Sequence, residues 1–195
     1  MARPAYRRLD VDERRRRLLA LGADLFARHD YADLSMAAIA REAGISKALL
    51  YHYFPSKQAY FTAALEQQAA ELAARVAPDP SLPPSDQLAT SLAAFLAWVD
   101  EHGDAYGKLV RSAGAVPDVR EVIDRVRAAT AAQILAGLPG PPTPERRAAV
   151  RAWLWFMDGA ILDWLEQRDL DRDGLLRLAL RTLEGALGEP LPRTT

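Results

Sequence analysis

Side chains suited to contacting nucleic acid are concentrated in one short segment, residues 43–57. Gly44 can adopt the positive φ that a sharp turn between two helices requires. Ser46 can cap the helix that follows by accepting a backbone N–H bond. Because Pro55 disfavours helical geometry at the residue before it, this helix must end after about two turns. The segment therefore predicts a tight turn, a short helix and, after Ser56, the start of another helix.

The short helix combines a polar face with an apolar back. Leu50 and Phe54 are four residues apart, which places them together as an anchor. The remaining side chains can donate hydrogen bonds to phosphates and base edges or stack on bases. They are Lys47, Tyr51, His52 and Tyr53. This composition favours an element that reads DNA.

Two further helices are expected ahead of this segment. Ser35 is placed to cap a helix over residues 35–43, whose apolar side chains share one stripe. A longer helix is expected over residues 12–29, where leucines and a phenylalanine recur at helical spacing. The three helices are expected to share one core, and the second and third form a helix-turn-helix.

The segment from about Asp12 to Leu65 resembles the N-terminal DNA-binding domain of the TetR family of bacterial transcriptional regulators. The resemblance rests on three groups in the family's order: Gly44-Ile45-Ser46, Leu50-Tyr51-His52-Tyr53-Phe54, and Lys57 at the start of the next helix. It covers the first third of the chain, whereas the rest matches the family only in length and helical character. The resemblance implies a DNA-binding repressor whose helical body binds a ligand and forms dimers.

The same resemblance implies a role for each polar side chain of the DNA-reading helix. Lys47 and His52 are expected to contact base edges, and Ala48 is expected to touch a thymine methyl group. Tyr51 and Tyr53 are expected at phosphates or sugars. For either tyrosine, a place in the core is the alternative.

Residues next to this helix complete the expected DNA interface. Ser35 is predicted to cap its helix and to donate to a phosphate, with capping alone as the alternative, and Ser46 is included as the second cap. Lys57 lies in the first turn of a helix whose free N–H groups attract phosphate. Leu49 replaces the threonine common in the family, so a hydroxyl contact with phosphate is expected to be missing.

Composition limits the class of protein. Half of the 195 residues are apolar, enough for a substantial core, and the absence of cysteine excludes disulfides, cysteine-based zinc fingers and thiol catalysis. No apolar run approaches the ~18 residues of a membrane span, and the N-terminal segment is too polar for a signal peptide. The sequence therefore predicts a cytoplasmic protein with no membrane partner.

Charge is distributed unevenly along the chain. Residues 1–57 contain 11 lysines and arginines against 7 acidic residues, whereas the rest of the chain contains 14 against 19. A basic N-terminal part favours binding to phosphates. An acidic remainder discourages the rest of the protein from settling on DNA.

The fold class predicted is all-α, with about nine helices and no strand alternation. Beyond the DNA-reading segment, helices are expected over residues 57–76, 85–101, 106–112, 117–137, 144–168 and 173–187. The expected organisation is a helix-turn-helix headpiece at residues 1–57 and a helical ligand-binding and dimerisation bundle at residues 58–195. The helix over residues 57–76 is expected to bridge the two.

Apolar stripes on the last two expected helices favour a dimer interface. Their periodicity is equally consistent with core helices of a monomer. A single short recognition helix reads few base pairs, and proteins of this kind usually dimerise on two half-sites about 34–36 Å apart. A homodimer on a near-palindromic operator is therefore predicted. The residues expected at its interface are Leu154, Ile161, Leu165, Leu176, Leu180, Leu183 and Leu187.

Aromatic residues concentrated in the C-terminal part suggest a pocket for a small, largely apolar or aromatic effector. A carboxylate among them could fix a polar or cationic group of that ligand. In the alternative, the aromatics fill the core and the aspartate faces solvent or pairs with an arginine. The predicted ligand residues are Phe95, Trp98, Tyr106, Trp153, Phe156, Met157, Asp158 and Trp164.

Two other chemistries have less support. Residues 169–174 match the first half of a calcium loop, but position twelve is Leu180 where a bidentate glutamate is required, so a turn capped by Asp171 or Asp173 is simpler. The alternative function is a small all-helical enzyme or a ligand-binding protein that uses the acidic and aromatic C-terminal cavity. Its nearest acid–base cluster, around His102, has the spacing of a helix end. No catalytic residue, metal or cofactor is predicted.

Overall fold

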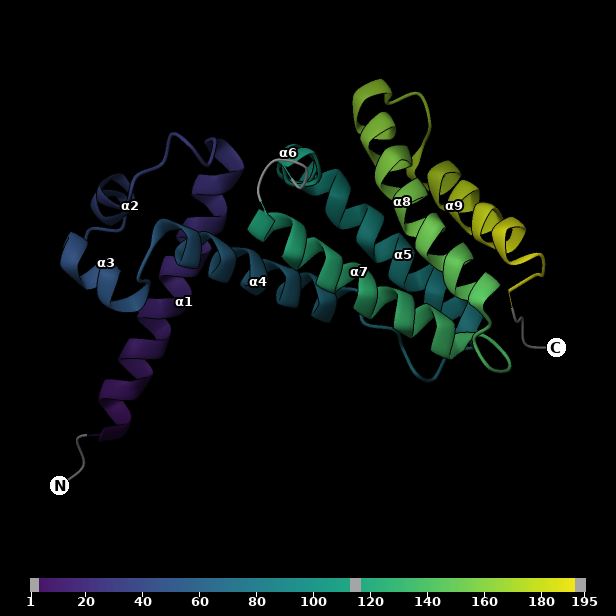
Figure 1. Cartoon of the computed structure of the whole chain (residues 1–195), viewed down its shortest axis with the longest axis horizontal. Coiled ribbons are helices and arrows are strands. Elements are labelled where there is room, and N and C mark those ends of the chain that lie inside the picture. Colours follow the sequence, from purple (N-terminus) through teal and green to yellow (C-terminus); the bar gives the residue numbers. More distant parts are fainter. Residues whose placement is uncertain (1–3, 113–116, 192–195) are drawn as a thin grey trace. The chain divides into compact units, whose positions relative to one another are not determined.

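The computed structural model describes residues 4–112 and 117–191 (Figure 1). Within these ranges the chain forms nine α-helices and no strand, which confirms the predicted all-α fold. None of the described helices combines the length and the apolar character that crossing a membrane demands. The helices are α1 (Pro4–Arg28), α2 (Met36–Glu42), α3 (Lys47–Tyr53), α4 (Lys57–Arg75), α5 (Pro84–Glu101), α6 (Gly103–Ser112), α7 (Pro117–Gly137), α8 (Pro144–Gln167) and α9 (Arg172–Leu187).

Most helix ends lie within two residues of the predicted positions, but two helices begin earlier. α1 begins at Pro4, a residue suited to the first helical position because proline has no N–H to leave unbonded. α6 begins at Gly103, directly after His102, the residue that caps α5. The N–H of Tyr106 donates to the His102 carbonyl (3.0 Å), so one residue ends α5 and accepts the first bond of α6.

The chain divides into two compact units, Met1–Ala70 and Glu71–Thr195, and the boundary falls within α4. Each unit has a separate hydrophobic core. In the first unit, α1, α2, α3 and the first half of α4 all contribute buried side chains. Representative ones are Leu19, Ile39, Leu50 and Tyr60.

The second unit is built around α8. Figure 1 places α8 between α7 and α9, and it packs against both of them and against α6. α5 packs against α6, α7 and α9. The buried side chains of α8 recur three or four residues apart, which places them on one stripe facing the core. They are Val150, Trp153, Met157, Ile161 and Trp164.

Candidate nucleic-acid interface

The turn between α2 and α3 is a Schellman motif. Gly44 has a φ of 64°, in the left-handed region that favours glycine. Its N–H donates to the Arg41 carbonyl (3.1 Å), and the N–H of Ile45 donates to the Ala40 carbonyl (3.0 Å), which closes the end of α2. A Cβ added at Gly44 would meet nothing within 4 Å, so the position requires glycine for its backbone conformation and not for space.

Serine side chains cap the helices that meet around this turn. Ser35 Oγ accepts from the N–H of Ala38 in α2, and Ser46 Oγ accepts from the N–H of Leu49 in α3, both at 3.1 Å. Ser56 makes the same kind of bond at the start of α4. The predicted capping by Ser35 and Ser46 is confirmed, and their contacts with DNA stay a prediction.

Opposite faces of α3 are buried and exposed. Leu50 and Phe54 lie in the core of the first unit, as predicted for the apolar anchor. Tyr51 is 42% exposed, and its ring centroid lies 5.7 Å from Nζ of Lys47. The exposed face brings together four of the predicted DNA-contact residues, Lys47, Ala48, Tyr51 and His52.

Tyr53 occupies an intermediate position on α3. Its side chain is half-buried, and its ring centroid lies 5.7 Å from that of His52 and 6.3 Å from that of Phe54. Tyr53 therefore packs partly against the core, which is the alternative that the sequence leaves open, and keeps part of its side chain exposed.

The Lys57 ammonium joins the start of α4 to the segment between α1 and α2. It donates to the Tyr31 carbonyl (2.7 Å) and the Leu34 carbonyl (2.9 Å), and it lies 4.2 Å from the Tyr31 ring centroid. Since an ammonium has three N–H donors, two of them are used within the protein. The phosphate contact of Lys57 stays a prediction. If Nζ makes that contact, it uses the third N–H donor.

The arginines of α1 have different partners. Arg16 and Arg17 both pair with Glu13, at 2.7 and 2.9 Å. The hydrogen bond from Arg17, followed by the charge of Arg16, lowers the pKa of the Glu13 carboxyl. Arg15 instead lies over Phe54, with its guanidinium 5.5 Å from the ring centroid, and so reaches the end of α3. The sequence alone does not identify Arg15. Residues 14–17 are four consecutive arginines that face different directions around the helix, and spacing does not show which of them faces α3.

Two tryptophans predicted to bind ligand are bonded to the backbone of the second unit. The Trp153 Nε1–H donates to the Ala179 carbonyl (2.8 Å), and the Trp164 Nε1–H donates to the Leu170 carbonyl (2.7 Å). Both indoles are buried, as is Met157. These three residues pack together in one core, and any contact they make with a ligand stays a prediction.

Three other predicted ligand residues, Phe95, Trp98 and Phe156, are half-buried against the same core. The Phe95 ring stands edge-on to the buried ring of Tyr106, with centroids 5.8 Å apart. Trp98 stacks on His102 at 4.9 Å. The structure therefore brings Phe95 and Tyr106 together, as a shared site requires.

Asp158 is already paired within the protein. Its carboxylate accepts hydrogen bonds from the Tyr106 hydroxyl (3.0 Å) and from the guanidinium of Arg127, and the Arg127 and Asp158 side chains are only 17% and 18% exposed. Burial, followed by the charge of Asp158, raises the pKa of the Tyr106 phenol. This pairing matches the alternative that an arginine neutralises the aspartate.

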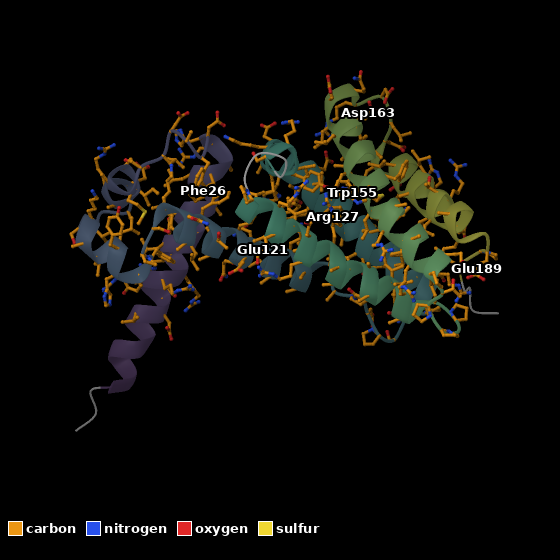
Figure 2. The ribbon with its side chains drawn as sticks, viewed as in Figure 1. Phe26, Glu121, Arg127, Trp155, Asp163 and Glu189 are labelled. Carbon is orange, nitrogen blue, oxygen red and sulfur yellow. The ribbon has the colours of Figure 1, made fainter. Side chains whose placement is uncertain are left out.

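Arg127 is a residue that the sequence did not single out. Its guanidinium lies 4.2 Å from the ring centroid of Trp155, and Figure 2 shows the two side chains next to each other. Trp155 is 61% exposed, although tryptophan is a large apolar side chain. Arg127 thus connects the half-buried carboxylate of Asp158 to an exposed indole on α8.

The predicted interface stripe of α8 and α9 faces largely inward. Ile161 and Leu183 are fully buried within one protomer, so neither has surface that a second chain could contact. The other five residues are half-buried and pack against the same core, namely Leu154, Leu165, Leu176, Leu180 and Leu187. The exposed sides of these helices carry Trp155 and Gly159 on α8, and Leu178 and Gly185 on α9.

Asp171 caps α9, as the simpler interpretation of the calcium-like segment predicts. Its Oδ1 accepts from the N–H of Gly174 at 2.6 Å. Among the described residues, no group of three or more potential ligands could hold a metal ion.

A short exposed helix with basic and aromatic side chains, held after a glycine turn on a three-helix core, defines the helix-turn-helix class of DNA-binding proteins. Residues 18–64 match the family model described as bacterial regulatory proteins, tetR family. Residues 84–183 match the model of the tetracyclin repressor-like C-terminal domain. The chain belongs to the TetR family of DNA-binding transcriptional regulators, and the enzyme alternative is excluded by this membership.

Solved structures agree with this assignment. A tetR-family transcriptional regulator from Streptomyces coelicolor is 32% identical, with 91% of this chain and 80% of that chain covered and a TM-score of 0.73. A transcriptional regulator from Rhodococcus sp. RHA1 is 22% identical (89% and 96% covered, TM-score 0.72). The regulator FadR from Bacillus subtilis, in complex with stearoyl-CoA, is 14% identical (87% and 95% covered, TM-score 0.67). The last two likenesses concern the fold alone.

Proposed function

We propose that this regulator is a repressor that binds a near-palindromic operator as a homodimer and is released by a small, largely apolar or aromatic effector. The exposed face of α3 carries this proposal, because it gathers Lys47, Ala48, Tyr51 and His52 on a helix of only seven residues. So short a helix contacts few base pairs, and two copies on adjacent half-sites supply the specificity that one lacks.

Individual side chains of this face divide between reading and positioning. Lys47 suits the O6 and N7 acceptors of guanine, His52 reads a neighbouring base edge, and Ala48 touches a thymine methyl group. Tyr51 and the exposed part of Tyr53 bind the sugar–phosphate backbone.

Residues flanking α3 are proposed to hold the phosphates on either side. Ser35 and Ser46 lie at the N-termini of α2 and α3, where free N–H groups attract anions. Lys57 adds the third donor of its ammonium. Arg15 extends this surface, because it lies over the last residue of the α3 anchor.

The homodimer is proposed to form through the exposed sides of α8 and α9. Trp155 supplies a large apolar side chain there, and tryptophan is enriched among the residues that dominate interface energies. A Cβ added at Gly159 or at Gly185 would meet nothing within 4 Å, so neither glycine is needed for packing inside the protomer. Glycines at such positions allow two helices to approach closely. The half-buried Leu154, Leu165, Leu176, Leu180 and Leu187 border this surface.

The effector is proposed to bind in the helical bundle of residues 58–195, next to the half-buried Phe95, Trp98 and Phe156. α4 bridges this part and the DNA-binding residues 1–57. A ligand that favours a different spacing of the two α3 helices lowers operator affinity by its differential affinity for the two states. The structure of FadR in complex with stearoyl-CoA is a precedent for a ligand with a long apolar chain in this fold.

Selection from a random duplex pool, combined with light scattering, tests this function. The wild-type protein is expected to have the mass of a dimer and to recover a near-palindrome with half-sites about 10 bp apart. Lys47→Ala is expected to relax the selected base at one position in each half-site. A monomer mass together with binding to a single half-site would contradict the homodimer. A ligand that binds at saturation and leaves operator affinity unchanged would contradict the coupling.

A further inference from the structure

Tyr60 of α4 is fully buried between the helices of the first unit. Its hydroxyl donates to the Leu18 carbonyl of α1 at 2.5 Å. A carbonyl oxygen has two lone pairs, so Leu18 can accept this bond as well as the helical one. Burial raises the pKa of the Tyr60 phenol, which keeps the hydroxyl protonated as a donor.

Gly22 provides the space that the Tyr60 ring occupies. A Cβ added at Gly22 would lie 2.9 Å from Cζ and 2.9 Å from Oη of Tyr60, and 3.0 Å from Cβ of Ala64. Real Cβ atoms essentially never make contacts this short, so a side chain at position 22 must displace the ring. Glycine weakens a helix interior. Its place in the middle of α1 is explained by this notch.

The same ring also contacts the end of α3. The Phe54 ring stands edge-on to Tyr60 with centroids 4.9 Å apart, and Phe54 is the C-cap residue directly after α3. The ring centroid of Phe26 in α1 lies 6.0 Å from that of Tyr60. Tyr60 therefore fills the space between α1 and the C-terminal end of the DNA-reading helix.

We infer that Tyr60, whose ring fits into the notch at Gly22, is a positioning residue that sets the location of α3 relative to α1. A helix of seven residues is too short to be stable alone, so its buried anchor determines where its exposed face points. Leu50 and Phe54 form that anchor, and Phe54 rests on Tyr60. Displacement of the ring shifts the face that reads DNA without changing its charge.

A positioning role and a merely structural role predict different effects on the two kinds of DNA binding. Base contacts depend on the placement of α3, whereas nonspecific binding depends on the number of phosphates neutralised. A displaced α3 lowers affinity for the selected duplex and leaves affinity for a scrambled duplex nearly unchanged. Loss of folding lowers both affinities together.

The test is a double-mutant cycle in the full chain with Gly22→Ala, Tyr60→Leu and the double variant. Each protein is titrated at fixed salt with the duplex that the wild type selects from a random pool and with a scrambled duplex of equal composition. Gly22→Ala is expected to lower the ratio of the two affinities at least tenfold, with scrambled binding within twofold. In the Tyr60→Leu background the same change is expected to lower the ratio less than twofold, because leucine does not fill the notch and leaves only the 3.0 Å contact with Cβ of Ala64, which a shift of a few tenths of an ångström relieves.

Two control variants sharpen the cycle. Gly137→Ala makes the same substitution at the end of α7, where the new Cβ meets only Pro84 at 3.8 Å, and the ratio is expected to stay at the wild-type value. Tyr60→Phe keeps the ring and removes the hydroxyl, and the ratio is expected to stay within threefold of wild type. A loss with Tyr60→Phe as large as with Tyr60→Leu would overturn the role of the ring.

Equal losses on both duplexes, or losses that multiply independently in the double variant, would also overturn the inference. Where Gly22→Ala alone does not fold, a double variant that folds and retains the affinity ratio of Tyr60→Leu supports it, and an unfolded double variant overturns it. The inference depends on the proposed operator binding only through the selected duplex. Failure of the wild type to select any sequence would remove that proposed function, whereas independent losses after normal selection remove this inference alone.

Discussion

Two buried tyrosines show how the units of the protein differ. Tyr60 in the first unit donates its hydroxyl to a backbone carbonyl, and Tyr106 in the second donates to the carboxylate of Asp158. Lys57 likewise donates hydrogen bonds to backbone carbonyls, whereas Arg127 donates to the same carboxylate as Tyr106. A carbonyl acceptor carries no charge that titration or a competing ion can remove. The polar contacts of Tyr60 and Lys57 are thus independent of any carboxylate charge, whereas those of Tyr106 and Arg127 depend on one.

The largest effect is expected from removing that carboxylate with Asp158→Ala. The change leaves the partly buried Arg127 guanidinium with only its longer ion pair to the exposed Asp124 (3.3 Å), and destabilisation of about 3 kcal/mol is expected. All four tryptophans lie in the second unit, so urea unfolding followed by tryptophan fluorescence measures it.

The exposed Asp163, labelled in Figure 2, supplies the matched control on the same helix. Asp163→Ala is expected to change stability by less than ~0.5 kcal/mol. Adding Arg127→Met to Asp158→Ala is expected to recover part of the loss, because the guanidinium that lost its buried partner is then removed. Equal effects of the two aspartate variants would contradict the distinction between the units.

A smaller effect is expected from Lys57→Met, which removes the ammonium that joins α4 to the segment before α2. Two hydrogen bonds from a charged donor are lost, and destabilisation of the first unit by about 2 kcal/mol is expected. Hydrogen exchange at the amides of α2 measures it. Arg41→Met, at an exposed site on α2, is the control. Unchanged exchange in the Lys57 variant would show that its two hydrogen bonds do not stabilise the first unit.

The smallest effect sharpens the comparison of the two tyrosines. Both phenols have a pKa raised above the ordinary value of about 10, so their contribution to stability is present below that pH and is lost as the pH rises above it. Burial is the cause for Tyr60, whereas the charge of Asp158 adds to burial for Tyr106.

Asp158→Asn is therefore expected to lower the pKa of Tyr106 and to leave that of Tyr60 unchanged. Alkaline titration of tyrosinate absorbance, with Tyr60→Phe and Tyr106→Phe to assign the two late steps, measures both values. A parallel shift of the two tyrosines would mean that their environments do not differ in charge.

Local signals in the sequence predicted much of this structure. Gly44 and Ser46 predicted the turn and the cap around α3, and apolar spacing marked the core-facing side of α8 and α9, where Ile161 and Leu183 are fully buried. These features depend on neighbours within a few residues, which a single sequence contains.

Contacts between distant residues could not be predicted in the same way. Arg127 pairs with an aspartate 31 residues away, and Tyr60 bonds to a carbonyl 42 residues away. Periodicity marks which side of a helix is apolar but not which partner covers it. For that reason Ile161 and Leu183 were expected at an interface between protomers and lie within one protomer.

Protection of guanine N7 from methylation on the selected duplex tests the central claim, that the exposed face of α3 reads DNA in pairs, most directly. The wild-type protein is expected to protect guanines in two major-groove patches about one helical turn apart. Lys47→Ala is expected to lose protection at one guanine in each patch and to keep the others. A single protected patch, or a pattern that Lys47→Ala leaves unchanged, would contradict the account.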